Sequence, residues 1–366
     1  MAGSTFGTNF TITTWGESHG AALGVVVDGC PAGLPLSESD IQICLDRRKP
    51  GQTTISTPRK EADQVRILSG VFDGKTTGTP ISLIVENTSQ KSADYSEIAS
   101  YYRPGHADYT FDAKYGFRDY RGGGRSSGRE TIGRVAAGAI ALKLLKELGI
   151  EVCAYTKSIG PICVPDGRFD KEAIYNTPTS MPDHETSVQA EQYLKKCMLE
   201  KDSSGGVIEC RIDGMPAGIG EPVFDKLSAQ LGKAVLSIGA VKAFEIGDGF
   251  AVSQAKGSEN NDSFMMADGK VTKKTNHAGG ILGGMSDSSQ ILLRAYIKPT
   301  PSIFRPQETV NKNGENITVE IKGRHDPVIV PRAVVVVEAM TALAVVDLLF
   351  ENMHARLDGI REFYRK

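Results

Sequence analysis

The sequence predicts an α+β fold, with antiparallel strands and helices in one domain, in preference to a doubly wound parallel sheet. Short β-branched runs that end at glycine or proline are typical of strands. Longer segments with apolar residues at helical spacing predict helices. The two kinds of element are mixed without strict strand–helix alternation, and no Ser/Pro-rich linker divides the chain. We therefore expect a single domain over residues 1–366.

Five runs have the character of strands. Each is β-branched or alternates apolar with polar residues, and each is bounded by glycine or proline. In chain order they are ALGVVVDG (22–29), QVRILSG (64–70), TPISLIVEN (79–87), GVIECRIDG (206–214) and QILLRAYIKP (290–299).

Helices are expected most clearly at 128–148 and 332–356, with further candidates at 37–48, 187–200 and 223–237. The most apolar stretch, residues 333–350, contains Glu338 and Asp347, so a buried core helix is expected there and not a membrane span. The polar, irregular segment 165–202 is expected to be a peripheral excursion that ends in a short helix.

An internal similarity suggests two related halves. DGCPAGLPLSESDI (28–41) resembles DGMPAGIGEPVFDKL (213–227), and SGVFDGKTTGTPISLIV (69–85) resembles GGILGGMSDSSQILLRA (279–295). Both pairs occur in the same order along the chain. We therefore expect a pseudo-twofold arrangement within one unit; the alternative is chance similarity among Gly/Pro turns.

Composition narrows the class of protein. Apolar residues make up 40% of the 366 and charged residues 23%, which is ordinary for a soluble globular domain. The net charge of −2 argues against general nucleic-acid binding. The six cysteines form no Cys-x-x-Cys pair, so we expect reduced thiols in the cytoplasm and predict no metal site. The first residues, MAGSTFGTNF, lack the pattern of a signal peptide.

The stretch DYRGGGRSSGRE (119–130) has the composition of an anion site. It fails as a Walker loop, because Arg129-Glu130 stands where Lys and a hydroxyl are required. It fails as a dinucleotide turn, because the third glycine would fall on Ser127. Ser127 and Glu130 instead have the spacing of a capping box at a helix start. Exposed amides at that start would attract anions; a capped helix with solvated arginines is an equal alternative for this window alone.

Cations are concentrated around this stretch. Six arginines lie between residues 103 and 134, interleaved with acidic residues, and a second cationic run covers 46–61. A chain of near-zero net charge has thus gathered its cations in two glycine-rich segments. This distribution favours a small, multiply anionic ligand over a polymer.

Seven blocks together resemble the chorismate synthase family over nearly the whole chain, most weakly in 165–202 and after 350. The blocks are TTWGESHG (13–20), RPGHADYT (103–110), YRGGGRSSGRE (120–130), AVKAFEIGDGF (240–250), NHAGGILGGMS (276–286), KPTPSI (298–303) and GRHDP (323–327).

The resemblance implies a β-α-β sandwich of antiparallel sheets around a helical core. It also implies an anti 1,4-elimination of phosphate from 5-enolpyruvylshikimate 3-phosphate to give chorismate, with reduced FMN as cofactor and no net redox change. A cytoplasmic homotetramer is expected, with no nucleic-acid or membrane partner. The reduced flavin would come from a separate flavin reductase or, as in some members that use NADP, from the protein itself.

The resemblance also assigns residues. His19 matches the histidine that protonates the departing phosphate, His106 the one beside the reduced flavin, and Asp347 the aspartate that takes up a proton relayed through the flavin. The substrate contacts implied are Arg48, Arg103, Ser127 and Arg129. The flavin contacts implied are Arg125, Ser126, Ser127, Gly239, Ala240, Gly283, Lys298, Thr300, Pro301, Ser302 and Arg324.

Two positions depart from the family pattern. Thr54 stands where many relatives have a substrate-binding arginine, and Gly239 replaces the usual asparagine before Ala-Val-Lys. A side-chain contact to the flavin would be lost at Gly239, whereas a backbone contact would survive. Two other functions remain as alternatives: a flavin oxidoreductase with net hydride transfer, and an RNA-binding protein suggested by RGGGR, which the single such unit and the net charge disfavour.

Overall fold

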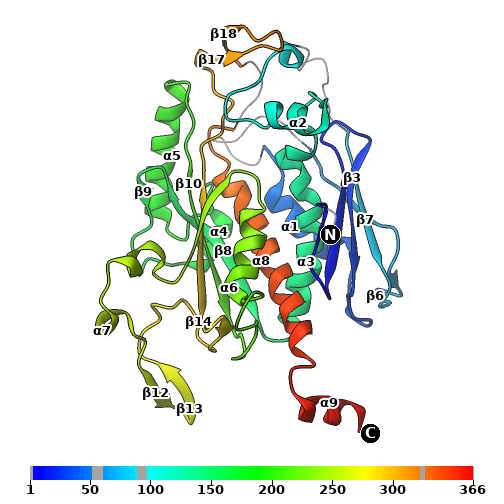
Figure 1. Cartoon of the computed structure of the whole chain (residues 1–366), viewed down its shortest axis with the longest axis vertical. Helices are drawn as coiled ribbons and strands as arrows, with labels where there is room; N and C mark the ends of the chain where they lie inside the picture. The colour runs from blue at the N-terminus through cyan, green and yellow to red at the C-terminus, as the bar shows by residue number, and fades with distance from the viewer. Residues whose placement is uncertain (1–2, 52–60, 89–96, 322–325, 366) are drawn as a thin grey trace.

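The computed structural model describes residues 3–51, 61–88, 97–321 and 326–365. Two five-stranded antiparallel sheets enclose a layer of helices (Figure 1). The first sheet has the order β1 (Thr5–Phe6), β2 (Thr11–Gly16), β3 (Ala22–Asp28), β7 (Ile81–Glu86) and β4 (Val65–Ile67). The second has the order β11 (Val241–Ile246), β16 (Ile291–Ile297), β10 (Gly206–Asp213), β8 (Glu151–Ile159) and β9 (Ile162–Cys163).

Four long helices fill the space between the sheets: α1 (Glu38–Arg48), α3 (Thr131–Glu147), α6 (Leu227–Leu236) and α8 (Val330–Asn352). The other helices are α2 (Asp108–Tyr115), α4 (Lys171–Asn176), α5 (His184–Leu199), α7 (Gly257–Asn260) and α9 (Leu357–Tyr364). The 3-10 turns are η2 (Glu97–Ser100), η3 (Gly124–Ser126), η4 (Gly128–Glu130) and η5 (Gly249–Ser253). Two-stranded hairpins are formed by β5 (Val71–Phe72) with β6 (Lys75–Thr76), β12 (Phe264–Ala267) with β13 (Lys270–Lys273), β14 (Ile281–Leu282) with β15 (Met285–Ser286), and β17 (Gln307–Val310) with β18 (Asn316–Val319).

The α+β sandwich and the five expected strands are confirmed, and each expected helix is present within a few residues of its predicted bounds. The alternating pattern of β16, with every second residue buried from Ile291 to Ile297, packs one face of the second sheet on the core. Both sheets bury their β-branched residues against α3 and α8, which contact each other along the centre of the molecule. This burial supplies the main driving force for the fold.

The expected pseudo-twofold arrangement is also confirmed. The sheet order β2-β3-β7-β4 of the first half recurs as β8-β10-β16-β11 in the second. The hydrogen bonds of the two turn regions match as well. Thr76 Oγ1 donates to Pro31 O (2.6 Å) and accepts from Leu34 N (3.0 Å). Ser286 Oγ donates to Pro216 O (2.6 Å) and accepts from the backbone amide of residue 219 (2.9 Å).

Helix α8 is long and apolar enough to cross a membrane by length and composition, but 78% of its most apolar window is buried inside the protein. It is the central core helix, as the interrupted apolar stretch predicted. Its buried Glu338 accepts a hydrogen bond from Arg47 at 2.5 Å and a second from Ala154 N at 3.3 Å. This pairing allows a carboxylate in the centre of an apolar helix.

Helices α3 and α8 begin at the same end of the sandwich, the upper end in Figure 1. Three contacts join these starts to the end of α1: Arg48 Nη1 donates to Gly128 O (3.2 Å) and to Thr131 Oγ1 (3.4 Å), and Arg332 Nε donates to Arg48 O (3.2 Å). Two positive helix-dipole ends therefore face the same region, which favours anions there.

Candidate active site

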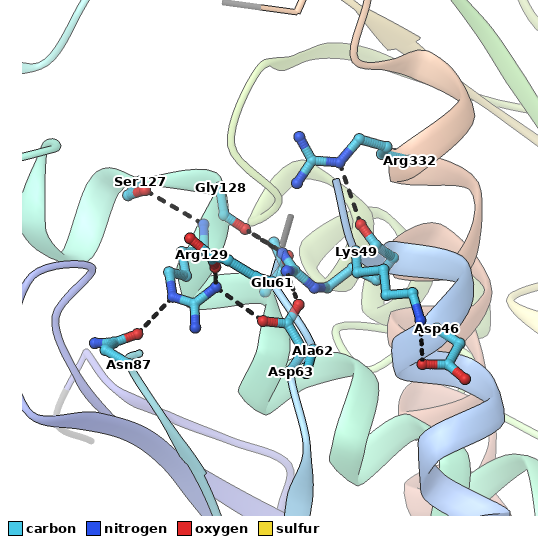
Figure 2. Close-up of polar contacts among 12 residues, drawn as sticks. Asp46, Lys49, Glu61, Ala62, Asp63, Asn87, Ser127, Gly128, Arg129 and Arg332 are labelled. Carbon is cyan, nitrogen blue, oxygen red and sulfur yellow. Dashed lines mark hydrogen bonds and ion pairs between the residues drawn. The ribbon is translucent and has the colours of Figure 1, made fainter. Parts of the chain in front are cut away.

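A cluster of buried ion pairs lies where α1 ends and α3 begins (Figure 2). The Asp63 side chain is fully buried and its two oxygens pair with different arginines: Oδ2 with Arg48, and Oδ1 with Arg129 Nη1 at 2.8 Å. Arg129 also pairs with Glu61 and donates through Nε to Asn87 Oδ1 at 2.6 Å. Because one carboxylate bridges both guanidinium groups, the two arginines predicted to bind substrate are held in fixed relative positions.

Arg103 and His106 form a second part of the site. Arg103 makes a two-pronged ion pair with Asp108, with both Nε and Nη2 at 2.8 Å from the carboxylate. Its Nη2 also lies 3.2 Å from His106 Nδ1. Burial would raise the pKa of Asp108, but hydrogen bonds and charge from Arg103 more than offset this effect and lower that pKa. The buried carboxylate therefore stays ionised and fixes Arg103 beside the imidazole.

The glycine run brings the two predicted catalytic histidines to one loop. A Cβ on Gly122 would lie 2.2 Å from His19 Cε1, and a Cβ on Gly123 would lie 3.1 Å from His106 Cε1. Because these glycines are consecutive, the two imidazoles lie at most about 12 Å apart. His19 is buried and its Nδ1 is 3.3 Å from Ser18 Oγ. Gly122 and Gly123 both have positive φ, so the run provides backbone freedom as well as space.

The predicted capping box is wrong in its details. Ser127 Oγ accepts a hydrogen bond from Arg129 N at 3.3 Å, but it caps the short turn η4, and α3 begins at Thr131. The Glu130 carboxylate accepts hydrogen bonds from Arg134 Nε (2.9 Å) and Thr14 Oγ1 (3.3 Å). Glu130 thus links the start of α3 to β2 through Thr14.

Arg125 does not point at the ion-pair cluster. Its Nη2 donates to Thr14 Oγ1 at 2.7 Å and its Nη1 to Gly16 O at 3.1 Å, so the guanidinium is tied to β2. Ser126 Oγ donates to Gly123 O at 2.8 Å. The assignment of Arg125 to the flavin and of Arg129 to the substrate stays a prediction. Arg129 lies in the anion cluster, and Arg125 anchors the glycine run to the first sheet.

Several predicted flavin contacts do lie together, across the loop from His106. Lys298 N donates to Ala240 O at 3.0 Å, and Lys298 Nζ donates to Gly105 O at 2.5 Å. A Cβ on Gly105 would lie 3.0 Å from Pro301 Cβ. Burial, and then the charge of Lys242, lowers the pKa of Lys298.

The remaining predicted flavin contacts are placed as follows. Ser302 is buried on the segment that follows Lys298, and Gly239 is exposed beside Ala240. Thr300 Oγ1 is buried and has no hydrogen-bond partner among the described residues. Arg324 and Thr54 lie outside the described residues.

Asp347 and Gly283 lie away from this set within the chain, and their assignment as site residues stays a prediction. Asp347 follows Arg332 by fifteen positions on α8, which places it about 22 Å along the helix from the start of α8. Gly283 precedes β16 whereas Lys298 follows it, so the length of that strand, about 23 Å, separates them. The carboxylate of the GRHDP block, Asp326, does lie at the correct end, where it pairs with Arg332 at 2.5 Å.

The Asp347 carboxylate has a structural explanation. It accepts hydrogen bonds from the backbone amides of Thr8 (2.9 Å), Asn9 (2.6 Å) and Phe10 (2.9 Å), and so ties the N-terminal segment to α8. The family resemblance assigns Asp347 a catalytic role, and the sequence does not reveal its structural partners because they are more than 330 positions away in the chain.

We expect Asp347→Asn to lower the free energy of unfolding by about 1–3 kcal/mol, because an amide can no longer accept all three bonds with ionised oxygen. We expect the turnover number to stay within about twofold of wild type, since the residue lies far from both histidines. Chemical denaturation and steady-state kinetics measure the two effects. A large fall in turnover with unchanged stability would restore Asp347 to the active site.

Fold and geometry together define a class of protein. It is an α+β sandwich enzyme that gathers arginines and two imidazoles at one end of a helical core, where two helices also begin. Such a site suits a small substrate with several negative charges.

Comparisons with known proteins identify the family. The chorismate synthase family model matches residues 10–350. Curated relatives named chorismate synthase are 68% identical in Lachnoclostridium phytofermentans and 67% identical in Lachnospira eligens, and both alignments cover 100% of each chain. A crystal structure of a chorismate synthase aligns with a TM-score of 0.77 and 29% identity, over 98% of this chain and 96% of that one. The chain therefore belongs to the chorismate synthase family, whose members are lyases of the shikimate pathway.

Proposed function

We propose that the protein converts 5-enolpyruvylshikimate 3-phosphate to chorismate and phosphate with the help of reduced FMN. The reaction takes place at the upper end of the sandwich in Figure 1, where α3 and α8 begin. The observation that carries this proposal is the pair of imidazoles held against consecutive glycines: His19 contacts Gly122, and His106 contacts Gly123. Three buried arginines lie in the two parts of the site. They are Arg48, Arg103 and Arg129.

The arginines bind the negative groups of the substrate, which carries one phosphate and two carboxylates. Each of the three is already oriented by a buried carboxylate, Asp63 for Arg48 and Arg129, and Asp108 for Arg103. Because the guanidinium groups are oriented before the substrate binds, they need little rearrangement when the phosphate begins to leave. The same carboxylates keep the cluster close to neutral while no ligand is bound, which limits the cost of burying the cations.

His19 donates the proton that the departing phosphate needs. The elimination breaks one C–H bond, whose hydrogen leaves as a proton, and one C–O bond; it forms one C=C bond and leaves phosphate with an extra negative charge, which the proton from His19 neutralises. An imidazole suits this step because it exchanges its proton near neutral pH. Ser18 Oγ, 3.3 Å from His19 Nδ1, helps to orient the ring, and Gly122 leaves the space that the ring occupies.

The residues near His106 fit a flavin. The Lys298 cation beside Gly105 suits an anionic group of the cofactor, and the unpartnered Thr300 hydroxyl can bond to it. We propose that Ser126, Ala240, Pro301 and Ser302 complete this contact set, and Arg324 belongs to it by family resemblance. Reduced FMN supplies an electron-rich partner that eases cleavage of the C–O bond without net redox change. His106, oriented by Arg103, holds or releases a proton next to it.

We also propose a cytoplasmic homotetramer that receives reduced flavin from a separate reductase. Six free cysteines support a reducing compartment. Two projecting elements support assembly, because they expose large apolar side chains at the lower end in Figure 1: Phe264 and Met266 on the β12–β13 hairpin, and Phe363 on α9. Exposed patches of this kind commonly mark contacts between proteins.

The proposed reaction is tested anaerobically. With chemically reduced FMN and enolpyruvylshikimate phosphate, we expect chorismate absorbance and free phosphate to appear in equal amounts, and no product with oxidised FMN. His106→Ala should lower the rate by about 10²-fold or more at unchanged fold. Consumption of a nicotinamide without chorismate would favour the alternative, a flavin oxidoreductase.

A further inference from the structure

A cavity of about 440 Å³ lies between α1, α4 and the first turns of α8. None of its lining residues belongs to the set predicted for substrate or flavin. Its volume is within the range of pockets that bind small molecules. It is therefore a candidate binding site distinct from the anion cluster.

The lining indicates which chemistry the cavity accepts. Every charged residue in it is a cation: Arg47, Lys49 and Arg332. Their carboxylate partners, Glu338, Asp46 and Asp326, are not part of the lining. The rest of the wall is largely apolar, with Ile174, Tyr175, Val334 and Val335 among its members. An apolar body with one negative group matches both features.

An aromatic ring is the best match for the apolar part. The Arg47 guanidinium lies 5.1 Å from the centre of the Tyr175 ring, so the floor of the cavity already pairs a cation with an aromatic face. Arg47 is fixed there by its 2.5 Å ion pair with the buried Glu338. A ligand ring can pack against Tyr175 and the valines of α8 while its carboxylate faces Lys49 and Arg332.

The cavity is connected to the substrate arginines through one residue. Arg332 lines the cavity, pairs with Asp326, and donates to Arg48 O at 3.2 Å. Arg47 and Arg48 are consecutive at the end of α1, where Arg47 faces the cavity and Arg48 pairs with Asp63. A ligand that draws Arg332 toward its carboxylate would loosen the hold on the Arg48 carbonyl.

We propose that this cavity binds a small aromatic carboxylate, and that its occupant weakens substrate binding through Arg332 and Arg48. The second half of this inference rests on the proposed function, and the first half does not. Binding at this cavity requires neither flavin nor substrate.

The binding half is tested by NMR on the full chain with labelled isoleucine methyl groups. The probe is 3-phenylpropionate, and the controls are its uncharged amide and inorganic phosphate. We expect saturable shifts at Ile43 and Ile174, which line the cavity, and none at Ile140, which is buried in α3. The amide and phosphate should bind at least about tenfold more weakly. Absence of shifts at Ile174, or equal shifts with the amide, would overturn the site.

Variants separate this cavity from the substrate site. Ile43→Trp fills the mouth, since Ile43 is 66% exposed at the rim, and Lys49→Gln removes one cation. Both should reduce the shift at Ile174, whereas Leu199→Trp on the exposed end of α5 should not. In the wild type, saturating 3-phenylpropionate should raise the KM for enolpyruvylshikimate phosphate at least threefold, and Ile43→Trp should abolish this effect. An unchanged KM with intact methyl shifts would disprove the coupling alone. Failure to form chorismate at all would disprove the proposed function and leave the methyl titration valid.

Discussion

Asp63→Asn is expected to have the largest effect of any single substitution in the anion cluster. The asparagine keeps the shape of the side chain and tolerates the left-handed backbone at this position, where φ is 46°. It removes the charge that pairs with both Arg48 and Arg129. Loss of one partner from a buried ion pair typically destabilises a protein by about 3–5 kcal/mol. We also expect kcat/KM to fall by about 10²-fold or more, because both substrate arginines lose their fixed positions.

Denaturation curves and steady-state kinetics on Asp63→Asn check this expectation, with Asp46→Asn as the matched control. Asp46 pairs with Lys49 at 2.9 Å, but the Lys49 and Asp46 side chains are 33% and 48% exposed. Loss of this ion pair should therefore lower the free energy of unfolding by at most about 1 kcal/mol. If Asp63 merely competed with the substrate for the arginines, Asp63→Asn would lower KM. A lower KM with unchanged kcat would therefore refute its positioning role.

Gly122→Ala is expected to lower turnover by about 10²–10³-fold, as the loss of a general acid would. The new Cβ would lie 2.2 Å from His19 Cε1 and 2.3 Å from Nδ1, so the imidazole must move. The backbone at Gly122 also has a φ of +64°, which adds strain to any alanine there.

Gly116→Ala separates the two causes. Gly116 has a φ of +79°, and nothing lies within 4 Å of its added Cβ, so this variant carries the backbone strain alone. We expect it to lose about 1 kcal/mol of stability and to keep nearly full activity. A double variant, Gly122→Ala with His19→Ala, should be little worse than either single one if both act on the same proton transfer. Wild-type turnover by Gly122→Ala would contradict the role of His19.

Much of the fold could be predicted from sequence because its signals are local. Alternation in β16 and the apolar run of α8 each specify an element and its buried face. The internal similarity even predicted the equivalent turns in which Thr76 and Ser286 make matching bonds. The start of α3 differs from the predicted one because of a tertiary contact. The Glu130 carboxylate bonds to Arg134 and Thr14 and does not form the predicted capping box.

The site was predictable only in part, because its geometry depends on contacts between distant residues. The motifs indicated His19, His106 and the arginines, and the structure gathers them at one end. Asp63 was missed, since an aspartate after a cationic run carries no local sign that it bridges two arginines. The structural role of Asp347 was missed, because its donors, the amides of residues 8–10, are not apparent from the sequence of α8.

The central claim is that substrate and flavin meet at the end of the sandwich where α3 and α8 begin. The most direct measurement is a crystal structure of the protein with enolpyruvylshikimate phosphate and FMN, grown without oxygen. We predict substrate anions within hydrogen-bonding distance of Arg48, Arg103 and Arg129, and flavin against Lys298 and Thr300 beside His106. Ligands bound elsewhere, with Asp63 and Glu61 still enclosing the arginines and no density near either histidine, would contradict the account.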